Sequence, residues 1–509
     1  MTDIYNIAVL MALSLSLAIA DESSAQDCYV PPESDLVIKG DALRWIDFPE
    51  ELEGETCLDI SQVNVSSIKR IFPENETGLD FRTIIFPETL TEIGDDAILV
   101  GLDYVHLPES LQQIGRDAFR SGNIEHVELP KNCAVVKEDA FRNNIISSFS
   151  WPTVDLYNFS GFKDNKLTSL HIPANVHSIG ASAFTDNPLE SVEFSEGLDT
   201  IGWGAFANFN RYYHNTNKYI PWDTVAAYTP IKSLTFPRSL KRISARAFYR
   251  VRALKTVNFA EGLVSMGDEA FFACDSIESV SFPSSLRSIG NSSFSLCTSL
   301  RSVELNEGIT NIAPLAFSGC QLSGMLHVPG SLTQIGYRAF ADAFEGGGNV
   351  DVVISEGVQT IANQAFAISL VSPEQPITIL NFSFPSTLRG IEANAFWGVW
   401  MDETPLPLIS ESGDSLRWDA YLDNVLIEEN VRTIGGLNRS GYNGFSRRSY
   451  VASVIERQSS LPIRSTQPEV IVYDLNGRKV YQGKREGAHS LRGVLIVRDG
   501  ESFSRLIKL

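Results

Sequence analysis

The chain has none of the sequence motifs that mark common enzyme classes or metal sites. Its 509 residues contain no G-x-S-x-G elbow, P-loop, HExxH pair, zinc-type cysteine spacing or glycine-rich dinucleotide turn. Serine, histidine and aspartate are present, but no motif brings them together. We therefore expect no enzyme activity, no cofactor and no metal ion.

Long hydrophobic runs are also scarce. Residues 7–20, IAVLMALSLSLAIA, are the one such run, and at 14 residues it is too short to span a bilayer. It ends in small residues, as a secretory signal does, although the first twenty residues contain no Lys or Arg. We expect a signal peptide at residues 1–25, cleaved after Ala20 or Ala25, and a secreted or outer-surface location without a transmembrane segment. A lipid anchor on Cys28 is the alternative.

Cysteine is rare as well. Six cysteines in a chain of this length are too few for a disulfide scaffold. Cys274, Cys297 and Cys320 each follow a recurring phenylalanine by three residues, so we expect buried thiols stacked side by side. In-register parallel side chains point alongside one another, which disfavours bridges between them. Cys28 and Cys57 are the better disulfide candidates.

Positive charge is in short supply over most of the chain. The net charge is -21, while residues Arg432 to Leu509 hold 14 Lys and Arg against 6 Asp and Glu, which leaves -29 on the remainder. An acidic body argues against a nucleic-acid partner, because phosphate binding needs a cationic face. The basic end indicates a separate C-terminal module.

What the chain has in abundance is a repeat. The segment LESVEFSEGLDTIGWGAF, Leu189 to Phe206, recurs with its apolar letters in place, and most repeats are 21 to 23 residues long. This period is typical of a solenoid, in which each unit covers the apolar face of the next. The closing aromatics are Phe119, Phe141, Phe162, Phe184, Phe206, Phe248, Phe271, Phe294, Phe317, Phe340, Phe366 and Phe396.

One repeat reads L-x-x-V-x-F-P-x-x-L-x-x-I-G-x-x-A-F-x-x-(N/C). Its first part alternates apolar and polar residues, which predicts a short strand that Pro ends. The rest returns through a turn or a short helical segment, so the fold is α/β or mainly β. We expect about fourteen coils with a parallel sheet on the concave face. The predicted strand starts are Phe81, Leu102, Ile124, Ile146, Leu167, Leu189, Ile231, Leu254, Ile277, Leu300, Leu322, Asn349, Ile379 and Leu422.

Three asparagines precede the cysteines at the same repeat position. Asn144, Asn165 and Asn187 each follow a repeat phenylalanine by three residues. A buried amide side chain can satisfy backbone groups at the tight turn of neighbouring coils. We expect these residues to form a structural ladder.

The repeat resembles the leucine-rich repeats of the BspA-like surface protein family, and the resemblance covers Phe81 to Gly435. Its motif P-x-x-L-x-x-I-G-x-x-A-F recurs about a dozen times. The resemblance implies a leucine-rich repeat solenoid that is secreted or displayed at the surface and binds other proteins. Adhesion to host or extracellular matrix components is the activity usually proposed for such proteins.

The ends and interruptions of the repeat suggest further parts. We expect an N-terminal cap at 26–80, a solenoid at 81–435, insertions at 209–229 and 397–421, and a linker at 436–467. The first insertion is rich in aromatic residues, as contact surfaces are. The alternative is an ordered flap that packs its rings on the solenoid. Its candidate partner-binding residues are Tyr212, Tyr213, Tyr219 and Trp222.

Residues 468–509 differ in style from the repeats. Strand-like segments flank Asn476-Gly477 and Asp499-Gly500, which predicts a small antiparallel β module. The stretch Tyr473 to Arg478, YDLNGR, resembles the C-terminal sorting domain of the type IX secretion apparatus, whose machinery would then be a partner. The alternative is a small β module with a structural role only.

Two polar rows flank the central Val of each predicted strand. One is a hydroxyl row that includes Ser148, Ser279 and Ser302, and the other mixes histidine, glutamate and hydroxyl residues. In the second row, His106 with Glu128 and His171 with Glu193 are expected to be cross-strand neighbours about 5 Å apart. A surface ion pair is the favoured interpretation of each over a transition-metal site. These four residues are the further candidate partner-binding residues.

Three classes of function remain open. The favoured hypothesis is an exported solenoid that binds an extracellular or host protein through its concave face and aromatic insertions. The second is a structural envelope component, or an exported glycoprotein using sequons such as Asn64-Val65-Ser66 and Asn381-Phe382-Ser383. The third, a hydrolase hidden in the insertions, would need a clustered acid and base that the sequence does not show.

Overall fold

The computed structural model describes residues 28–49, 52, 55–72, 79, 81–98, 101–209, 229–344, 348–368, 378–385, 387–392 and 395–396, with strand segments between Val425 and Lys508. It divides into two compact units, Met1–Leu189 and Glu190–Leu509, which are treated separately below. The expected signal peptide, the linker, nearly all of the first insertion and the second insertion lie outside the described residues.

In unit 1, most coils contribute one strand to each of two rows, and paired strands within a row run parallel. The coil at residues 146–162 has isolated bridges at Leu156 and Phe159 in place of a second-row strand. The first row consists of β3 (Cys57–Asp59), β5 (Thr83–Ile85), β7 (Tyr104–His106), β9 (His126–Glu128), β11 (Ser148–Ser150) and β12 (Ser169–Ile172). The second row consists of β4 (Ser67–Ile68), β6 (Glu92–Ile93), β8 (Gln113–Ile114), β10 (Val135–Val136) and β13 (Ser178–Ile179).

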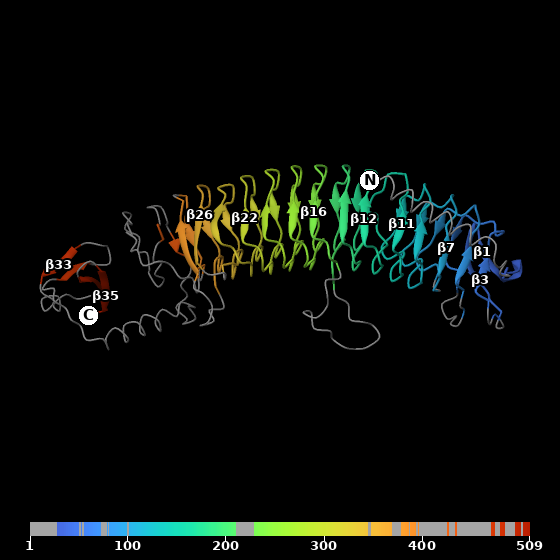
Figure 1. Cartoon of the computed structure of the whole chain (residues 1–509), viewed down its shortest axis with the longest axis horizontal. Coiled ribbons are helices and arrows are strands. Elements are labelled where there is room, and N and C mark those ends of the chain that lie inside the picture. Colours follow the sequence, from blue (N-terminus) through green and yellow to red (C-terminus); the bar gives the residue numbers. More distant parts are fainter. Residues whose placement is uncertain are drawn as a thin grey trace, which may run out of the picture. The chain divides into compact units, whose positions relative to one another are not determined.

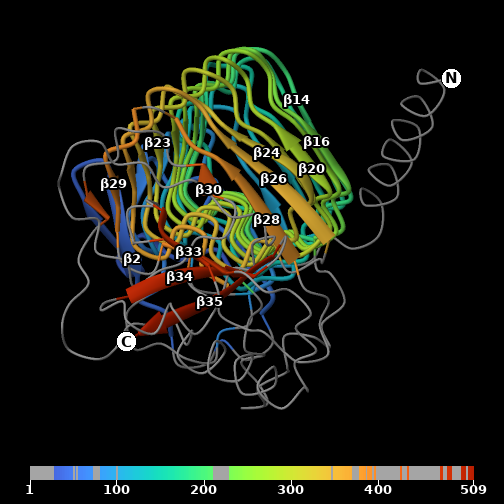
Figure 2. The same cartoon turned by 90° about the vertical axis from the view of Figure 1, so that its left-hand side faces the viewer.

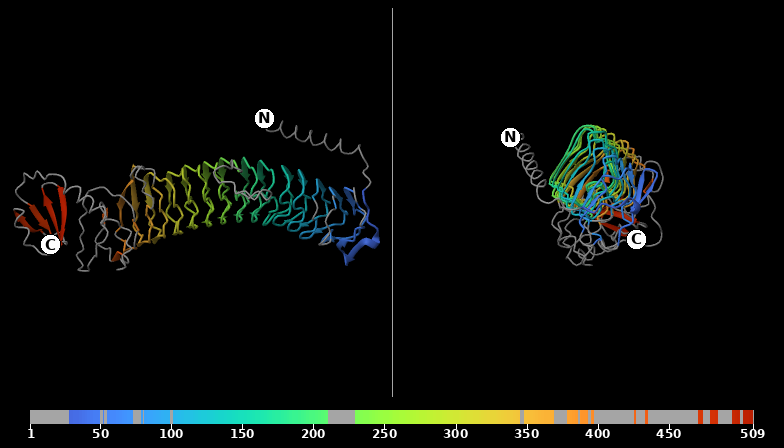
Figure 3. Two further views of the ribbon diagram at one scale, coloured as in Figure 1. Left: turned by 90° about the horizontal axis from the view of Figure 1, so that it is seen from below. Right: turned by 90° about the vertical axis from the view of Figure 1, so that its right-hand side faces the viewer.

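Unit 2 repeats this plan (Figure 1). Its first row is β14 (Ser191–Phe194), β16 (Ser233–Thr235), β18 (Thr256–Asn258), β20 (Ser279–Ser281), β22 (Ser302–Glu304), β24 (Gly324–Val328), β26 (Gly348–Ile354), β28 (Thr378–Ser383) and β30 (Val425–Leu426). Its second row is β15 (Thr200–Ile201), β17 (Arg242–Ile243), β19 (Ser265–Met266), β21 (Ser288–Ile289), β23 (Asn311–Ile312), β25 (Gln334–Ile335), β27 (Thr360–Ile361), β29 (Gly390–Ile391) and β31 (Thr433–Ile434). The two rows lie on different sides of the coils (Figure 2), which follow one another in sequence order (Figure 3).

The return path of the coil is the main departure from expectation. We expected a turn or a short helical segment, but in the described coils the Leu-x-x-Ile part forms a two-residue strand before it turns. In the described part of the chain, the single helix is the 3-10 turn η1 (Glu33–Asp35). The fold is therefore a mainly β solenoid with parallel strands. First-row strands generally begin two residues after the predicted start, because the leading apolar residue is buried in the preceding turn.

The beginning of unit 1 combines a hairpin with coil-type pairing. Strands β1 (Leu36–Lys39) and β2 (Ala42–Ile46) pair antiparallel, and β2 then pairs parallel with β4. The expected disulfide is confirmed, since Cys28 bonds to Cys57 with 4.6 Å between their Cα atoms. Near the other end of the chain, β32 (Val470–Tyr473), β33 (Lys479–Gly483), β34 (Val494–Asp499) and β35 (Ser502–Lys508) pair antiparallel.

A column of phenylalanine rings fills the core of each unit, as the repeat predicts. In unit 2 the rings of Phe248 and Phe271 stack at 5.1 Å between centroids with 9° between planes. The same near-parallel stacking runs from Phe206 to Phe396 in this unit and from Phe119 to Phe184 in unit 1. A second column, from Phe236 through Phe259 to Phe282, meets the first edge-on. Offset and edge-on contacts are the arrangements that aromatic quadrupoles favour.

On several coils, the residue three positions after the core phenylalanine links that coil to the coil before it. Asn144 donates from Nδ2 to the carbonyl of Phe119 at 2.8 Å, while its Oδ1 accepts from the backbone N–H of Ile124 at 3.2 Å. Asn165 and Asn187 repeat this pattern. The expected asparagine ladder is thus confirmed. On three coils of unit 2, the thiol of Cys274, Cys297 or Cys320 occupies this position and donates to the phenylalanine carbonyl of the preceding coil.

A carboxylate clamp that the repeat motif did not reveal joins neighbouring coils of unit 2 in pairs. Glu261 accepts hydrogen bonds from the backbone N–H groups of Ser284 and Ser285 on the next coil, at 2.9 and 3.2 Å. In return, the hydroxyl of Ser285 accepts the N–H of Gly262 at 2.9 Å. Gly262 has a φ of 124°, and a Cβ there would collide with the Arg238 carbonyl. The other clamps pair Glu196-Gly197 with Ser239, Glu307-Gly308 with Ser331, and Glu356-Gly357 with Thr387.

Truncating one ring of the column should destabilise unit 2. Phe271→Ala removes a fully buried ring between two stacked neighbours, so we expect a loss of about 3–5 kcal/mol in the free energy of unfolding. Urea unfolding followed by far-ultraviolet circular dichroism measures the loss. Val264→Ala, at an exposed site, serves as the control and should change stability by less than about 0.5 kcal/mol. Equal effects of the two changes would contradict the stacked column.

Removing one clamp carboxylate should loosen the turn that it holds. Hydrogen bonds from Ser284 and Ser285 lower the pKa of Glu261, so its contribution is present above the usual glutamate pKa and disappears as pH falls through the lowered value. Glu261→Ala should speed amide exchange at Ser284 and Ser285 near neutral pH, whereas Glu278→Ala, on an exposed strand flank, should not. Unchanged exchange in the first variant would rule out the clamp.

Candidate functional site

The outward face of the first-row strands is mostly polar in both units, as predicted. In most of these strands the central apolar residue is buried and one or both of its neighbours are exposed, for example Ser279 and Ser281 around Val280. In-register pairing lines the exposed residues up between coils, so that Ser279 lies opposite Ser302 and Ser281 opposite Glu304. The predicted hydroxyl row, which includes Ser148, is exposed. These aligned side chains supply hydrogen-bond donors and acceptors on consecutive coils.

The predicted histidine and glutamate candidates occupy this face, but only some of their contacts are described. His106 on β7 and Glu128 on β9 are exposed, and His171 on β12 and Glu193 on β14 are exposed in their own units. In the described part of unit 1, Glu128 pairs with His126 of its own strand, with 4.0 Å between Oε1 and Nε2. The expected pairing of His106 with Glu128 therefore has no ion pair to support it in the described residues.

His126 is a residue of this face that the sequence analysis passed over. Its Nδ1 lies 2.8 Å from the hydroxyl of Ser148 on the neighbouring strand, and its Nε2 approaches Glu128. It occupies the column of small hydroxyl residues, where the repeat consensus drew attention to serine. A histidine at an outward position where other repeats have serine was the signal in the sequence that could have identified this residue.

The aromatic candidates Tyr212, Tyr213, Tyr219 and Trp222 lie outside the described residues. Next to the insertion, Phe209 stacks on Trp203 at 5.3 Å, and Tyr249 stacks on Phe272 at 5.1 Å. The guanidinium groups of Arg246 and Arg250 lie over the Tyr249 ring at 5.6 and 5.1 Å. The coil surface beside the insertion is thus lined with aromatic and cationic groups.

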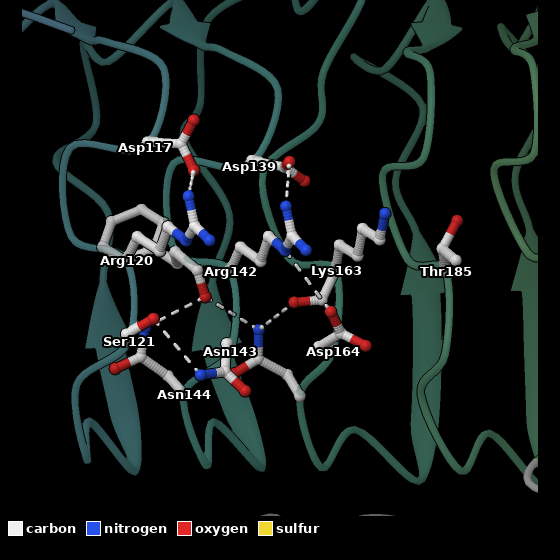
Figure 4. Close-up of polar contacts among 12 residues, drawn as sticks. Asp117, Arg120, Ser121, Asp139, Arg142, Asn143, Asn144, Lys163, Asp164 and Thr185 are labelled. Carbon is white, nitrogen blue, oxygen red and sulfur yellow. Dashed lines mark hydrogen bonds and ion pairs between the residues drawn. The ribbon is translucent and has the colours of Figure 1, made fainter. Parts of the chain in front are cut away.

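A half-buried polar cluster on the turns of unit 1 is the other concentration of charge (Figure 4). Arg142 is 3.1 Å from Asp139 in its own turn and 3.5 Å from Asp164 on the next coil. Asp117 is 3.5 Å from Arg120, and burial, followed by the nearby charge of Asp139, raises the pKa of Asp117. Because the acids face arginines, the cluster reads as a structural ion network that links coils.

The described residues contain no group of three or more His, Cys, Asp or Glu side chains that could hold a metal ion. They also contain no helix that is long and apolar enough to cross a membrane. On the described polar face, the imidazoles of His126 and His327 contact the hydroxyls of Ser148 and Ser355 at 2.8 and 2.6 Å. Their chemistry is that of binding through hydrogen bonds, charges and exposed side chains.

Comparison with protein families now adds to this geometry. The family model of the BspA-type leucine-rich repeat region, in 6 copies, matches residues 69–160, 157–221, 223–346 and 341–438. The chain belongs to the BspA-type leucine-rich repeat family. The family model begins before Phe81, in line with the coil-type pairing of β2 and β4, and it ends near the predicted solenoid boundary at Gly435.

Solved structures of other leucine-rich repeat proteins are similar to this BspA-type chain. A leucine-rich repeat protein from Bacteroides ovatus is 20% identical over 72% of this chain and 84% of its own, with a TM-score of 0.48. The pneumococcal vaccine antigen PcpA is 17% identical over 73% and 86%, with a TM-score of 0.35. A leucine-rich cell surface protein from Faecalibacterium prausnitzii is 17% identical over 81% and 100%, with a TM-score of 0.35. Among curated proteins, no sequence match was found.

The expected buried thiols of this BspA-type chain are confirmed. Cys274, Cys297 and Cys320 are buried, and each thiol donates to the carbonyl of the phenylalanine on the preceding coil at 3.3 Å. Burial raises the pKa of all three well above the usual range for cysteine, and raises that of Cys133 to about 12. Since the thiolate is the reactive form, these four thiols should be inert in the folded protein.

Thiol counting tests this assignment directly. With a colorimetric disulfide reagent near pH 8, we expect no reactive thiol in the native protein, 4 after denaturation and 6 after denaturation with reduction. The last step reports the Cys28–Cys57 bond. Rapid labelling of the native protein would contradict burial, and 6 thiols before reduction would contradict the disulfide.

Proposed function

We propose that this protein is a secreted or surface-displayed binding protein that recognises an extracellular or host protein through the exposed face of its first-row strands. The observation that carries the proposal is the in-register array of exposed polar side chains on consecutive coils, above a mainly apolar core. Repeat proteins of this kind use such extended surfaces for binding. An adhesive role fits the signal-like start and the names of similar proteins, one a vaccine antigen and one a cell surface protein.

The finer features of the proposal come from the sequence. They are a concave binding face on a solenoid of about fourteen coils, contributions from His106, Glu128, His171 and Glu193, and further contacts from Tyr212, Tyr213, Tyr219 and Trp222. The proposal also assigns residues 468–509 to recognition by secretion machinery. Binding is the function that we assign.

Bulky charges on the proposed face should abolish binding. The double variant Ser279→Arg/Ser302→Arg places two long cations on adjacent exposed positions of β20 and β22. We expect it to lose at least about tenfold in affinity for immobilised extracellular matrix proteins that bind the native chain, measured by surface plasmon resonance. Asn311→Arg/Gln334→Arg adds the same charge on exposed positions of the second row and is the matched control. Binding that survives in the first variant, or falls equally in both, would refute the face.

A further inference from the structure

Two exposed apolar side chains interrupt the polar face in unit 1. Ile85 on β5 is 39% exposed and Tyr104 on β7 is 54% exposed. The two strands pair in register, with Ile85 opposite His106 and Thr83 opposite Tyr104, so these four residues share one face. Among the described first-row strands of unit 1, no other outward position holds an exposed large apolar residue. The isoleucine and the tyrosine thus form a local apolar patch beside a histidine.

The surroundings of this patch are acidic. Glu128 is exposed on the neighbouring strand β9, Glu125 is exposed just before it, and Glu88 and Glu109 are exposed just beyond β5 and β7. In the described structure, the side chains of Glu88, Glu109 and Glu125 have no hydrogen-bond or ion-pair partner. The cation at the start of β5, Arg82, is already paired with Asp103 at 3.1 Å. Exposed Lys131, just beyond β9, is one cation beside these four glutamates, so the surroundings keep a net negative charge.

We propose that Ile85, Tyr104 and Glu128 mark a docking patch for a protein segment that carries Arg or Lys beside an apolar side chain. A cation over the exposed tyrosine ring gains a cation–π interaction, and the same cation can reach the glutamate. The isoleucine offers the apolar contact. The charge of -29 upstream of Arg432 attracts such a segment over a longer range. This inference rests on the proposed function and names the chemistry of its partner.

Two histidines border this patch. His106 lies between Ile85 of β5 and the β9 residues His126 and Glu128. His126 contacts the hydroxyl of Ser148 and approaches Glu128. Both histidines therefore belong to the surface that a docked segment would cover.

Peptide binding to the full-length protein tests the patch. The probe is a labelled peptide with an Arg-Val-Gly repeat, and its counterpart has Glu in place of Arg; binding is read by fluorescence anisotropy. Tyr104→Ala and Glu128→Gln should each weaken binding of the Arg peptide about threefold or more. The matched controls are Met325→Ala and Glu304→Gln, which change an exposed apolar residue and an exposed glutamate on the same row of unit 2. They should leave binding unchanged.

One further readout distinguishes the patch from an apolar contact alone, because the Glu peptide should not bind. Equal losses in patch and control variants, or binding of the Glu peptide, would overturn the inference. If matrix-protein binding still depends on Ser279 and Ser302, the proposed function stands without the patch. If that binding does not depend on Ser279 and Ser302, the proposed function is refuted separately.

Discussion

The structure depends on the requirement that each coil cover its neighbour completely. The rings of the core column lie 5.1 to 5.7 Å apart from Phe206 to Phe396, close to the spacing of adjacent strands, so neighbouring coils are in close contact along the column. Backbone N–H groups of these phenylalanines donate to the next coil, as Phe271 does to Ser293 at 2.8 Å. Stacking and hydrogen bonding thus act along the same axis.

This constraint explains which features the sequence predicted well. The phenylalanine column, the asparagine ladder and the buried thiols all occupy positions where only a few residue types satisfy the neighbouring coil, so they recur at a fixed spacing. The disulfide was a weaker prediction, because it depended on two cysteines near one end of the chain and on an exported setting. The periodicity of the sequence therefore predicts the contacts that recur from coil to coil.

Other features escaped because periodicity carries no signal for them. The second-row strands are two residues long, too short for an alternating pattern to show. Leu296 and Leu315 adopt a φ of 61°, a left-handed conformation that leucine rarely takes, and the coil-to-coil hydrogen bonds of the turn hold them there. A turn detected by glycine or proline alone would be missed at Leu296, whereas Pro314 precedes Leu315. Tertiary contacts decide these conformations.

The candidate site shows the opposite relation to the repeat. Core positions are informative when they keep the consensus, whereas outward positions are informative when they depart from it. Ile85, Tyr104 and His126 replace the small hydroxyl or polar residues usual on their rows, and nothing in the coil requires them. The consensus of each row pointed to His106 and Glu128 but not to their apolar neighbours. Binding specificity in such a protein resides in these exceptions.

The carboxylate clamp has a consequence for how this chain could have grown. Each coil with Glu-Gly is followed by a coil with Ser or Thr at the receiving turn, so coils of unit 2 come in two kinds that alternate from Glu196 to Thr387. Copying or losing a single coil would set two carboxylates, or two receiving turns, side by side. Duplication of two neighbouring coils together preserves every clamp. We therefore expect this part of the protein to gain or lose coils two at a time.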